Sequence, residues 1–134
     1  MRRNPAEPNP TSETSPGGGS DSLRDLFRGS AEVLVLSILA GGPRHGYSIL
    51  SQLKTLGAGD FALKEGTLYP LLYRLVRKGW TESQWRVGET GKKQKVYQLT
   101  DEGRRVQQKR RREWIQFTAA VRSLLEGIDA NNDE

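Results

Sequence analysis

The chain has 134 residues, a length typical of one domain, and no apolar run approaches the roughly 18 residues of a membrane-spanning helix. It contains no cysteine and one histidine, His45, which excludes a disulfide framework, a thiolate metal site and a histidine-rich metal centre. The net charge of +5 is concentrated in residues 23–125, which hold 19 of the 21 Lys and Arg but 9 of the 16 Asp and Glu, and this favours a polyanionic partner.

The two ends of the chain differ from its middle. Residues 1–22 are rich in Pro, Gly, Ser and Thr and lack apolar periodicity, which predicts a disordered tail that cannot offset its ordering entropy. Their polarity is unlike a secretory signal, so a soluble, cytoplasmic protein is expected. Residues 129–134 predict a short acidic tail.

Two helices are predicted before residue 57. The first covers residues 22–40, with a weak point at Gly29 and an alternative start at Ser30, so it can be two pieces. Its end is marked by the glycine pair and proline of residues 41–43. The second runs from about Gly46 to Leu56, with apolar residues at helical spacing.

The third predicted helix has two contrasting faces. Its N-cap is placed at Thr67, because Pro70 then falls in the first turn, where its missing N–H is harmless. Gly79 ends it. One face is apolar and is expected in the core: Leu68, Leu71, Leu72 and Leu75. The other begins with small residues and continues with hydroxyl groups and arginines: Gly66, Thr67, Pro70, Tyr73, Arg74 and Arg77. Such a face suits a DNA major groove, although a merely solvated face is the competing interpretation.

A β-hairpin and a long helix complete the predicted order. Residues 80–87 and 95–99 have strand character, and the basic segment 88–94 between them forms the turn. Thr100 is a good N-cap for a helix that reaches about Gly127. The fold is therefore expected to be mainly α with a small β-hairpin. It combines a winged helix-turn-helix at 23–99 with a C-terminal dimerisation helix at 100–128.

The last helix carries an apolar seam. Its members are spaced 3, 4, 3 and 4 residues apart: Trp114, Phe117, Val121, Leu124 and Ile128. Two heptads are too short to hold a coiled coil alone, so the first helix should contribute to the same interface through Leu23, Leu26 and Phe27. The seam predicts a homodimer, and the alternative is that it folds back onto its own domain.

The ordered motifs resemble the PadR family of transcriptional regulators over roughly residues 23–128. The matching residues are Gly42 to Tyr47, Glu65 to Pro70 with Leu75 and Gly79, then Trp85, Gly91, Lys92, Lys93, Tyr97, Leu99, Thr100 and Gly103. The resemblance implies a homodimeric winged-helix DNA-binding regulator, usually a repressor, of the subfamily with a short C-terminal helix. It also implies small aromatic or cationic inducers, and places Trp114 where the subunits meet and flat ligands can stack.

Two positions depart from the family pattern. Trp80 stands where an aliphatic residue is usual, and the wing carries lysines where arginines are more frequent. Lysine still serves phosphate but loses the bidentate geometry that reads a base.

The candidate DNA-binding residues come from three elements. They are Tyr47 and Ser48 at the start of the second helix, Thr67, Tyr69, Arg74 and Arg77 on the third, and Lys92, Lys93 and Lys95 in the wing. For Tyr69 the competing interpretation is packing, and His45 is interpreted as a loop cap. Solvated surface is favoured for Arg104, Arg105, Lys109, Arg110, Arg111 and Arg112.

The predicted function is sequence-specific regulation of transcription on a palindromic operator, with a possible small aromatic effector. No catalytic constellation, metal site or cofactor motif is present in the sequence, so an enzyme is not expected. The alternative is a winged-helix module for protein–protein contact, although such a module would not need basic residues on both the third helix and the wing.

Overall fold

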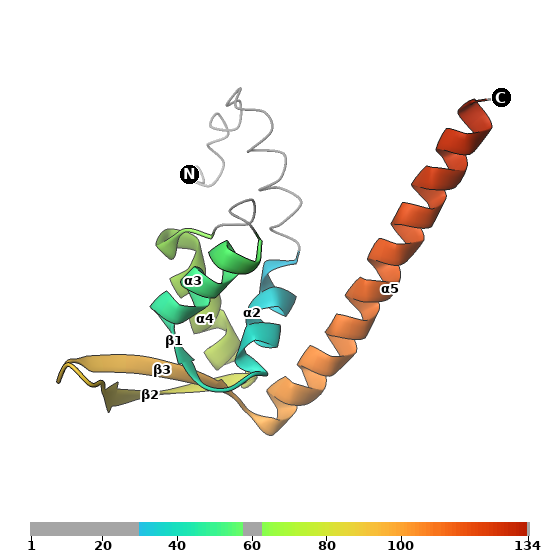
Figure 1. The fold of residues 1–134 in the computed structure, drawn as a ribbon. Coiled ribbons are helices and arrows are strands. Elements are labelled where there is room, and N and C mark those ends of the chain that lie inside the picture. Colours follow the sequence, from blue (N-terminus) through green and yellow to red (C-terminus); the bar gives the residue numbers. More distant parts are fainter. Residues whose placement is uncertain (1–29, 58–62, 134) are drawn as a thin grey trace, which may run out of the picture.

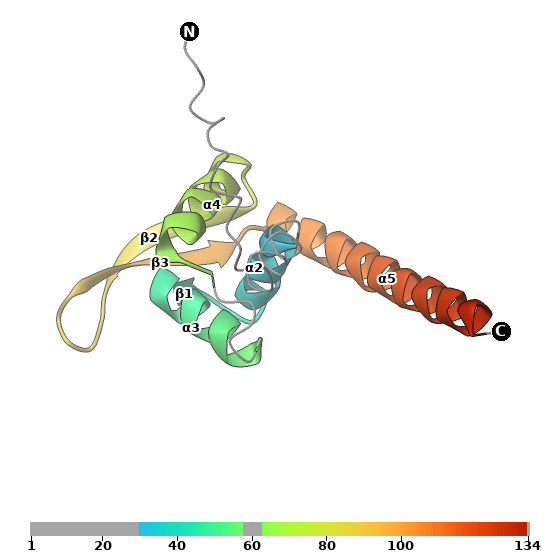
Figure 2. The same ribbon diagram turned by 90° about the horizontal axis from the view of Figure 1, so that it is seen from above.

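The computed structural model describes residues 30–57 and 63–133. Their elements are α2 (Ala31–Leu39), β1 (Arg44–His45), α3 (Gly46–Leu56), α4 (Glu65–Arg77), β2 (Thr81–Val87), β3 (Lys93–Leu99) and α5 (Asp101–Asn132). Three short helices form a body, from which the β2–β3 hairpin and α5 extend on opposite sides (Figure 1 and Figure 2). This confirms the mainly helical winged helix-turn-helix with a long final helix. The predicted tail at 1–22 and the residues Leu23, Leu26 and Phe27 lie outside the described ranges.

The core lies between the three short helices and the base of the hairpin. Apolar side chains at helical spacing on α2, α3 and α4 meet two residues of β3 there: Val35, Leu36, Leu39, Ile49, Leu53, Leu68, Leu71, Leu72, Leu75, Tyr97 and Leu99. The predicted apolar face of the third helix is therefore confirmed, since all four of its leucines are buried. Because the leucine face of α4 is buried in this core, the opposite face of α4 points to solvent.

The helix starts show one correct and one wrong prediction. The first described helix, α2, begins at Ala31 directly after Ser30, as the alternative start required. The N-cap of α4 is Lys64 and not Thr67. The Lys64 carbonyl accepts hydrogen bonds from the N–H groups of Thr67 and Leu68, both at 2.9 Å, so the first turn forms before Thr67. Pro70 is tolerated inside the helix because Gly66, whose carbonyl it leaves without an intrahelical donor, is exposed to water.

The hairpin is longer than predicted and gains a third strand. The turn is shorter than residues 88–94, because the Gly88 N–H donates to the Lys92 carbonyl at 2.9 Å and Gly91 adopts φ +86°. Lys93 and Lys95 are consequently strand residues. The two-residue strand β1 was not predicted, and it pairs antiparallel with β3 to give the strand order β1-β3-β2.

The start of α5 is docked on the body. Thr100 caps the helix as predicted, because its Oγ1 accepts from the Gly103 N–H at 3.0 Å and donates to the Gly79 carbonyl at 2.7 Å. Gln107 Nε2 donates to Ser37 Oγ on α2 at 3.1 Å. Beyond this contact the helix leaves the body and continues to Asn132, past its predicted end near residues 127–128 (Figure 1).

One stripe runs along the whole of α5 at alternating spacings of four and three residues. We call it the α5 stripe: Gly103, Gln107, Arg110, Trp114, Phe117, Val121, Leu124 and Ile128. Its first three members pack on the body, whereas the last four are exposed. Within the described residues, the predicted seam therefore does not fold back onto its own chain.

Candidate nucleic-acid interface

The outer face of α4 is open along its whole length. All six residues that the sequence assigned to it are exposed, from Gly66 to Arg77. The helix begins with residues that have little or no bulk and ends with two arginines in its last turn. Arg77 Cζ lies 5.8 Å from the centre of the Tyr73 ring, so this pair forms one broad cationic and aromatic surface. Tyr73, which was not among the candidate site residues, belongs to the same surface.

The start of α3 lies beside this face but offers less to a phosphate than expected. Tyr47 is 69% exposed. The Ser48 N–H is already used, because it donates to His45 Nδ1 at 3.2 Å, which confirms His45 as a capping residue. One of the free amides on which the predicted phosphate contact at Ser48 depended is therefore occupied.

Tyr69 connects α4 to α3. A Cβ at residue 46 would overlap the Tyr69 hydroxyl and ring, so only glycine at this position lets the tyrosine cross the end of α3. Tyr69 nevertheless remains 42% exposed. Burial, and to a smaller extent the nearby Tyr69, raises the pKa of Tyr97 at the base of the wing. Tyr69 thus has a packing role, and part of its ring still faces solvent.

The strand register divides the charges of the wing between its two faces. Val87 pairs with Lys93 and Trp85 with Lys95, in line with the buried pair Thr81 and Leu99. Because side chains alternate along a strand, Lys93 and Lys95 lie on the face that packs against the helices at its base. Arg86 lies on the opposite face. Lys92 is in the turn.

Trp85 is the residue of this surface that sequence reasoning missed. Trp85 is 64% exposed, and Lys95 Nζ lies 5.8 Å from the centre of its ring. It occupies the same face as Lys93 and Lys95, just beyond the end of the core. The alternation of side chains along β2 could have identified Trp85. Residues 81, 83 and 85 must all lie on one face of the strand, and residue 81 is buried against the core.

Four residues join α5 to the end of α4. Glu32 of α2 forms ion pairs with Lys78, at 3.0 Å, and with Arg110 of α5. Both cations also lie against the Trp80 ring, with Lys78 Nζ at 4.5 Å and Arg110 Cζ at 4.8 Å from its centre. The expectation of solvated surface was therefore wrong for Arg110. We call Glu32, Lys78, Trp80 and Arg110 the Glu32–Trp80 cluster, and it gives the unusual Trp80 a structural role.

The cluster changes the titration of its carboxylate. Burial acts to raise the pKa of Glu32, but hydrogen bonds and charges from Lys78 and Arg110 outweigh it and hold the pKa below the usual 4.5. A carboxyl with a lowered pKa in the folded state contributes stability above pH 4.5, and this contribution is lost as the pH falls through its folded pKa.

Replacing Glu32 with glutamine is expected to lower the free energy of unfolding by about 1–2 kcal/mol at pH 7, because the site is intermediate between an exposed and a buried ion pair. The difference from wild type should shrink once the pH falls below 4.5. Urea denaturation at pH 7 and pH 3.5 measures both values. A difference that stays constant with pH would show that the carboxylate charge is not what stabilises the cluster.

A winged helix-turn-helix with a basic wing and an open recognition helix defines a class of DNA-binding modules. Residues 35–109 match the model of the transcriptional regulator PadR-like family. The chain therefore belongs to the PadR-like family of transcriptional regulators, and it is a DNA-binding protein that regulates transcription.

Solved structures from several bacteria agree with this assignment. A PadR family transcriptional regulator from Eggerthella lenta is 36% identical, with a TM-score of 0.68 over 80% of this chain and 91% of that one. A PadR family regulator from Clostridium difficile is 30% identical, with a TM-score of 0.63 over 72% of this chain and 98% of that one. An uncharacterized protein of Lysinibacillus sphaericus is 27% identical over 78% of this chain and 96% of its own length. In the described part of the chain, no helix is long and apolar enough to cross a membrane.

Proposed function

We propose that the protein is a homodimeric repressor that binds a palindromic operator through α4 and the wing. The observation that carries the DNA contact is the outer face of α4, which is exposed from Gly66 to Arg77 and ends in two arginines. Thr67, Arg74 and Arg77 would reach into the major groove, while Tyr47 and the wing lysines would contact phosphates. Trp85 would pack on the sugar edge beside Lys93 and Lys95.

The homodimer is supported by the distal half of the α5 stripe. Phe117, Val121, Leu124 and Ile128 are exposed on a helix that stands away from the body (Figure 1), and Leu125 widens the same apolar surface. Large apolar side chains gathered on one helix are costly to leave in water, and a second copy would cover them. Two-fold pairing would also repeat α4 at the spacing of operator half-sites.

A ligand role for Trp114 follows from its position in the stripe. The ring is half-buried where α5 leaves the body, and it meets Phe117 edge to face with 5.8 Å between ring centres. In a dimer this pair would lie where the subunits meet, and a flat aromatic effector would stack there. A protein that binds an operator must share a compartment with the DNA, so we propose that this protein is cytoplasmic.

Replacing Arg74 with alanine is expected to weaken binding to the operator by about 1–3 kcal/mol and to relax its base preference, since a bidentate contact to guanine is lost. Gel shifts with DNA from upstream of the protein's own gene, and with single-base variants of the site found there, measure both effects. Arg105→Ala is the matched control, because it removes the same charge from an exposed position at the start of α5.

Unchanged affinity for Arg74→Ala, with the fold intact, would remove Arg74 from the interface. A wild-type protein that does not distinguish the promoter fragment from unrelated DNA would favour the protein–protein module instead.

Replacing Lys93 and Lys95 together with alanine should weaken binding to all DNA sequences alike. Each phosphate contact contributes about 0.9 to the slope of log affinity against log salt, so the slope should decrease by about two units. Titrations between 50 and 200 mM salt measure it. Arg86→Ala, which changes a cation on the other face of the same hairpin, should leave the slope nearly unaltered. If Arg86→Ala lowered the salt slope as much per charge as the lysine double variant, the face of the hairpin on which a cation lies would not determine its contact with DNA.

A further inference from the structure

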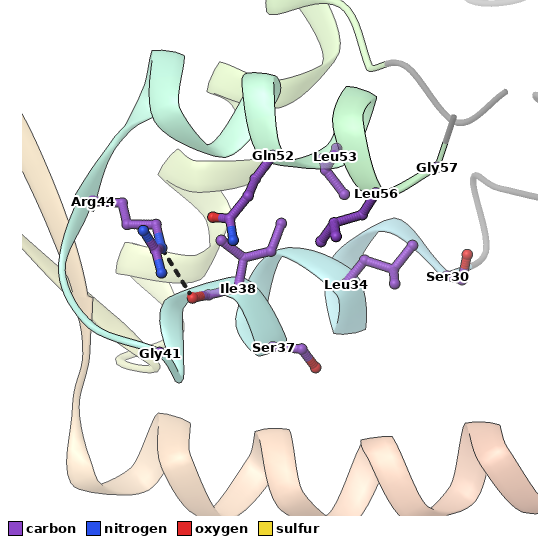
Figure 3. Close-up of a pocket in the computed structure, with 10 residues that line it drawn as sticks. All are labelled: Ser30, Leu34, Ser37, Ile38, Gly41, Arg44, Gln52, Leu53, Leu56 and Gly57. Atoms are coloured by element: carbon purple, nitrogen blue, oxygen red, sulfur yellow. Dashed lines mark hydrogen bonds between the residues drawn. The ribbon is translucent and has the colours of Figure 1, made fainter. Parts of the chain in front are cut away.

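An apolar cavity lies between α2 and α3 (Figure 3), and its described lining includes no residue of the exposed half of the α5 stripe or of α4. Its volume is about 580 Å³, within the range of sites that hold small molecules. Four apolar side chains form most of its wall, two from each helix: Leu34, Ile38, Leu53 and Leu56. Leu56 is 73% exposed and therefore lacks a packing partner over most of its surface among the described residues.

Gln52 is the polar group that this cavity leaves unsatisfied. Its side chain extends from α3 into the space between the two helices (Figure 3). The Oε1 atom is buried and has no hydrogen-bond partner among the described residues. A buried acceptor without a donor is unfavourable, so the site is suited to a molecule that supplies one.

The charge of the wall indicates the class of molecule. Among the ten described residues that line the cavity, Arg44 alone is charged, and its Nε already donates to the Ile38 carbonyl at 3.3 Å. An ion would have to leave water for a wall made mainly of leucine and isoleucine side chains, which is costly. A neutral molecule avoids this cost.

We propose that the cavity binds a neutral, largely apolar small molecule that carries one N–H or O–H group and donates it to Gln52 Oε1. The site lies within one subunit, so it is separate from the ligand role of Trp114 and does not require the dimer. A bound molecule would contact α3 and Arg44 of β1, the two elements that adjoin the His45 cap at the DNA-facing end of α3.

The test uses the full chain and the fluorescent probe N-phenyl-1-naphthylamine, which is neutral, apolar and has one N–H group. The isosteric ether 1-phenoxynaphthalene, which lacks this donor, is measured by displacement of the probe. On the wild type we expect the amine to bind about two- to tenfold more tightly than the ether, the range of one net hydrogen bond. In Gln52→Leu this preference should disappear.

Two further variants locate the bound probe. Leu34→Trp fills the cavity and should abolish the preference for the amine over the ether, while Trp114→Ala removes the aromatic ring of the α5 stripe and should leave this preference unchanged. Thermal melting measures whether each variant is folded. The comparison of amine with ether is made on the wild type, so it does not depend on any variant being folded. The proposal is overturned if the wild type does not bind the probe, if amine and ether bind the wild type equally, or if Trp114→Ala abolishes the preference for the amine. Without the probe, the operator affinity of Gln52→Leu should equal that of the wild type. A failure of the cavity proposal can therefore be told apart from a failure of the DNA-binding proposal.

Discussion

Replacing Val121 and Leu124 with aspartate is expected to convert the protein to monomers that no longer bind a palindromic operator. Both side chains lie in the exposed half of the α5 stripe, where they are 38% and 66% exposed. In a homodimer they would become buried, and four aspartates facing each other across the interface could not be desolvated. Loss of the second half-site should reduce operator affinity by about 10²- to 10⁴-fold, the gain that linked binding sites provide. Sedimentation at micromolar concentration and gel shifts measure the two effects.

The matched control places the same charges on the other side of the helix. Ala119 and Ser123 are exposed and lie roughly opposite the α5 stripe, so Ala119→Asp with Ser123→Asp should remain dimeric. The body is expected to stay folded in both double variants, because residues 111–133 contribute nothing to its core. A monomeric wild type, or a dimer that survives the first double substitution, would show that the stripe is not the interface.

The substitution Gly103→Ala is expected to lower the free energy of unfolding by about 3 kcal/mol or more, the range of severe overpacking. In an ordinary helix the same change stabilises, because alanine has the higher helix propensity. Here a Cβ at residue 103 would overlap the carbonyl oxygen of Trp80, which is main chain and accepts a hydrogen bond from the Thr100 N–H at 3.0 Å. The whole start of α5 must therefore move, together with the Glu32–Trp80 cluster.

Gly127→Ala is the control within the same helix. Nothing lies within 4 Å of a Cβ built at residue 127, so this variant should be more stable than wild type by about 0.5–1 kcal/mol. Urea denaturation at equal protein concentration compares the two, since association contributes to apparent stability. A stabilising effect of Gly103→Ala would mean that α5 does not approach Trp80 as closely as described.

The candidate interface was predictable where local rules determine it. The two faces of α4 follow from the spacing of its leucines, and the basic turn of the hairpin follows from its glycines and lysines. Two features were beyond those rules. Thr67 has good capping chemistry, but Lys64 is the N-cap, because the exposed Gly66 lets water satisfy the carbonyl that Pro70 leaves free. From the sequence, Trp85 is recognisable only as a residue of the family motif, and it is the strand register that places it opposite Lys95.

Sequence by itself determined the order of the helices and of the hairpin, the buried leucines of α4, the caps at His45 and Thr100 and the heptad spacing along α5. These depend on contacts within a few residues, and side-chain periodicity reports them directly. Only the tertiary structure decided how the α5 stripe is divided, with Gln107 and Arg110 docked on the body and Phe117 onward exposed. It also decided the pairing of β1 with β3, the joining of Glu32 to Arg110 across 78 residues, and the cavity beside Gln52. Such contacts join residues far apart in the chain, so packing of the whole body selects them and no local pattern can.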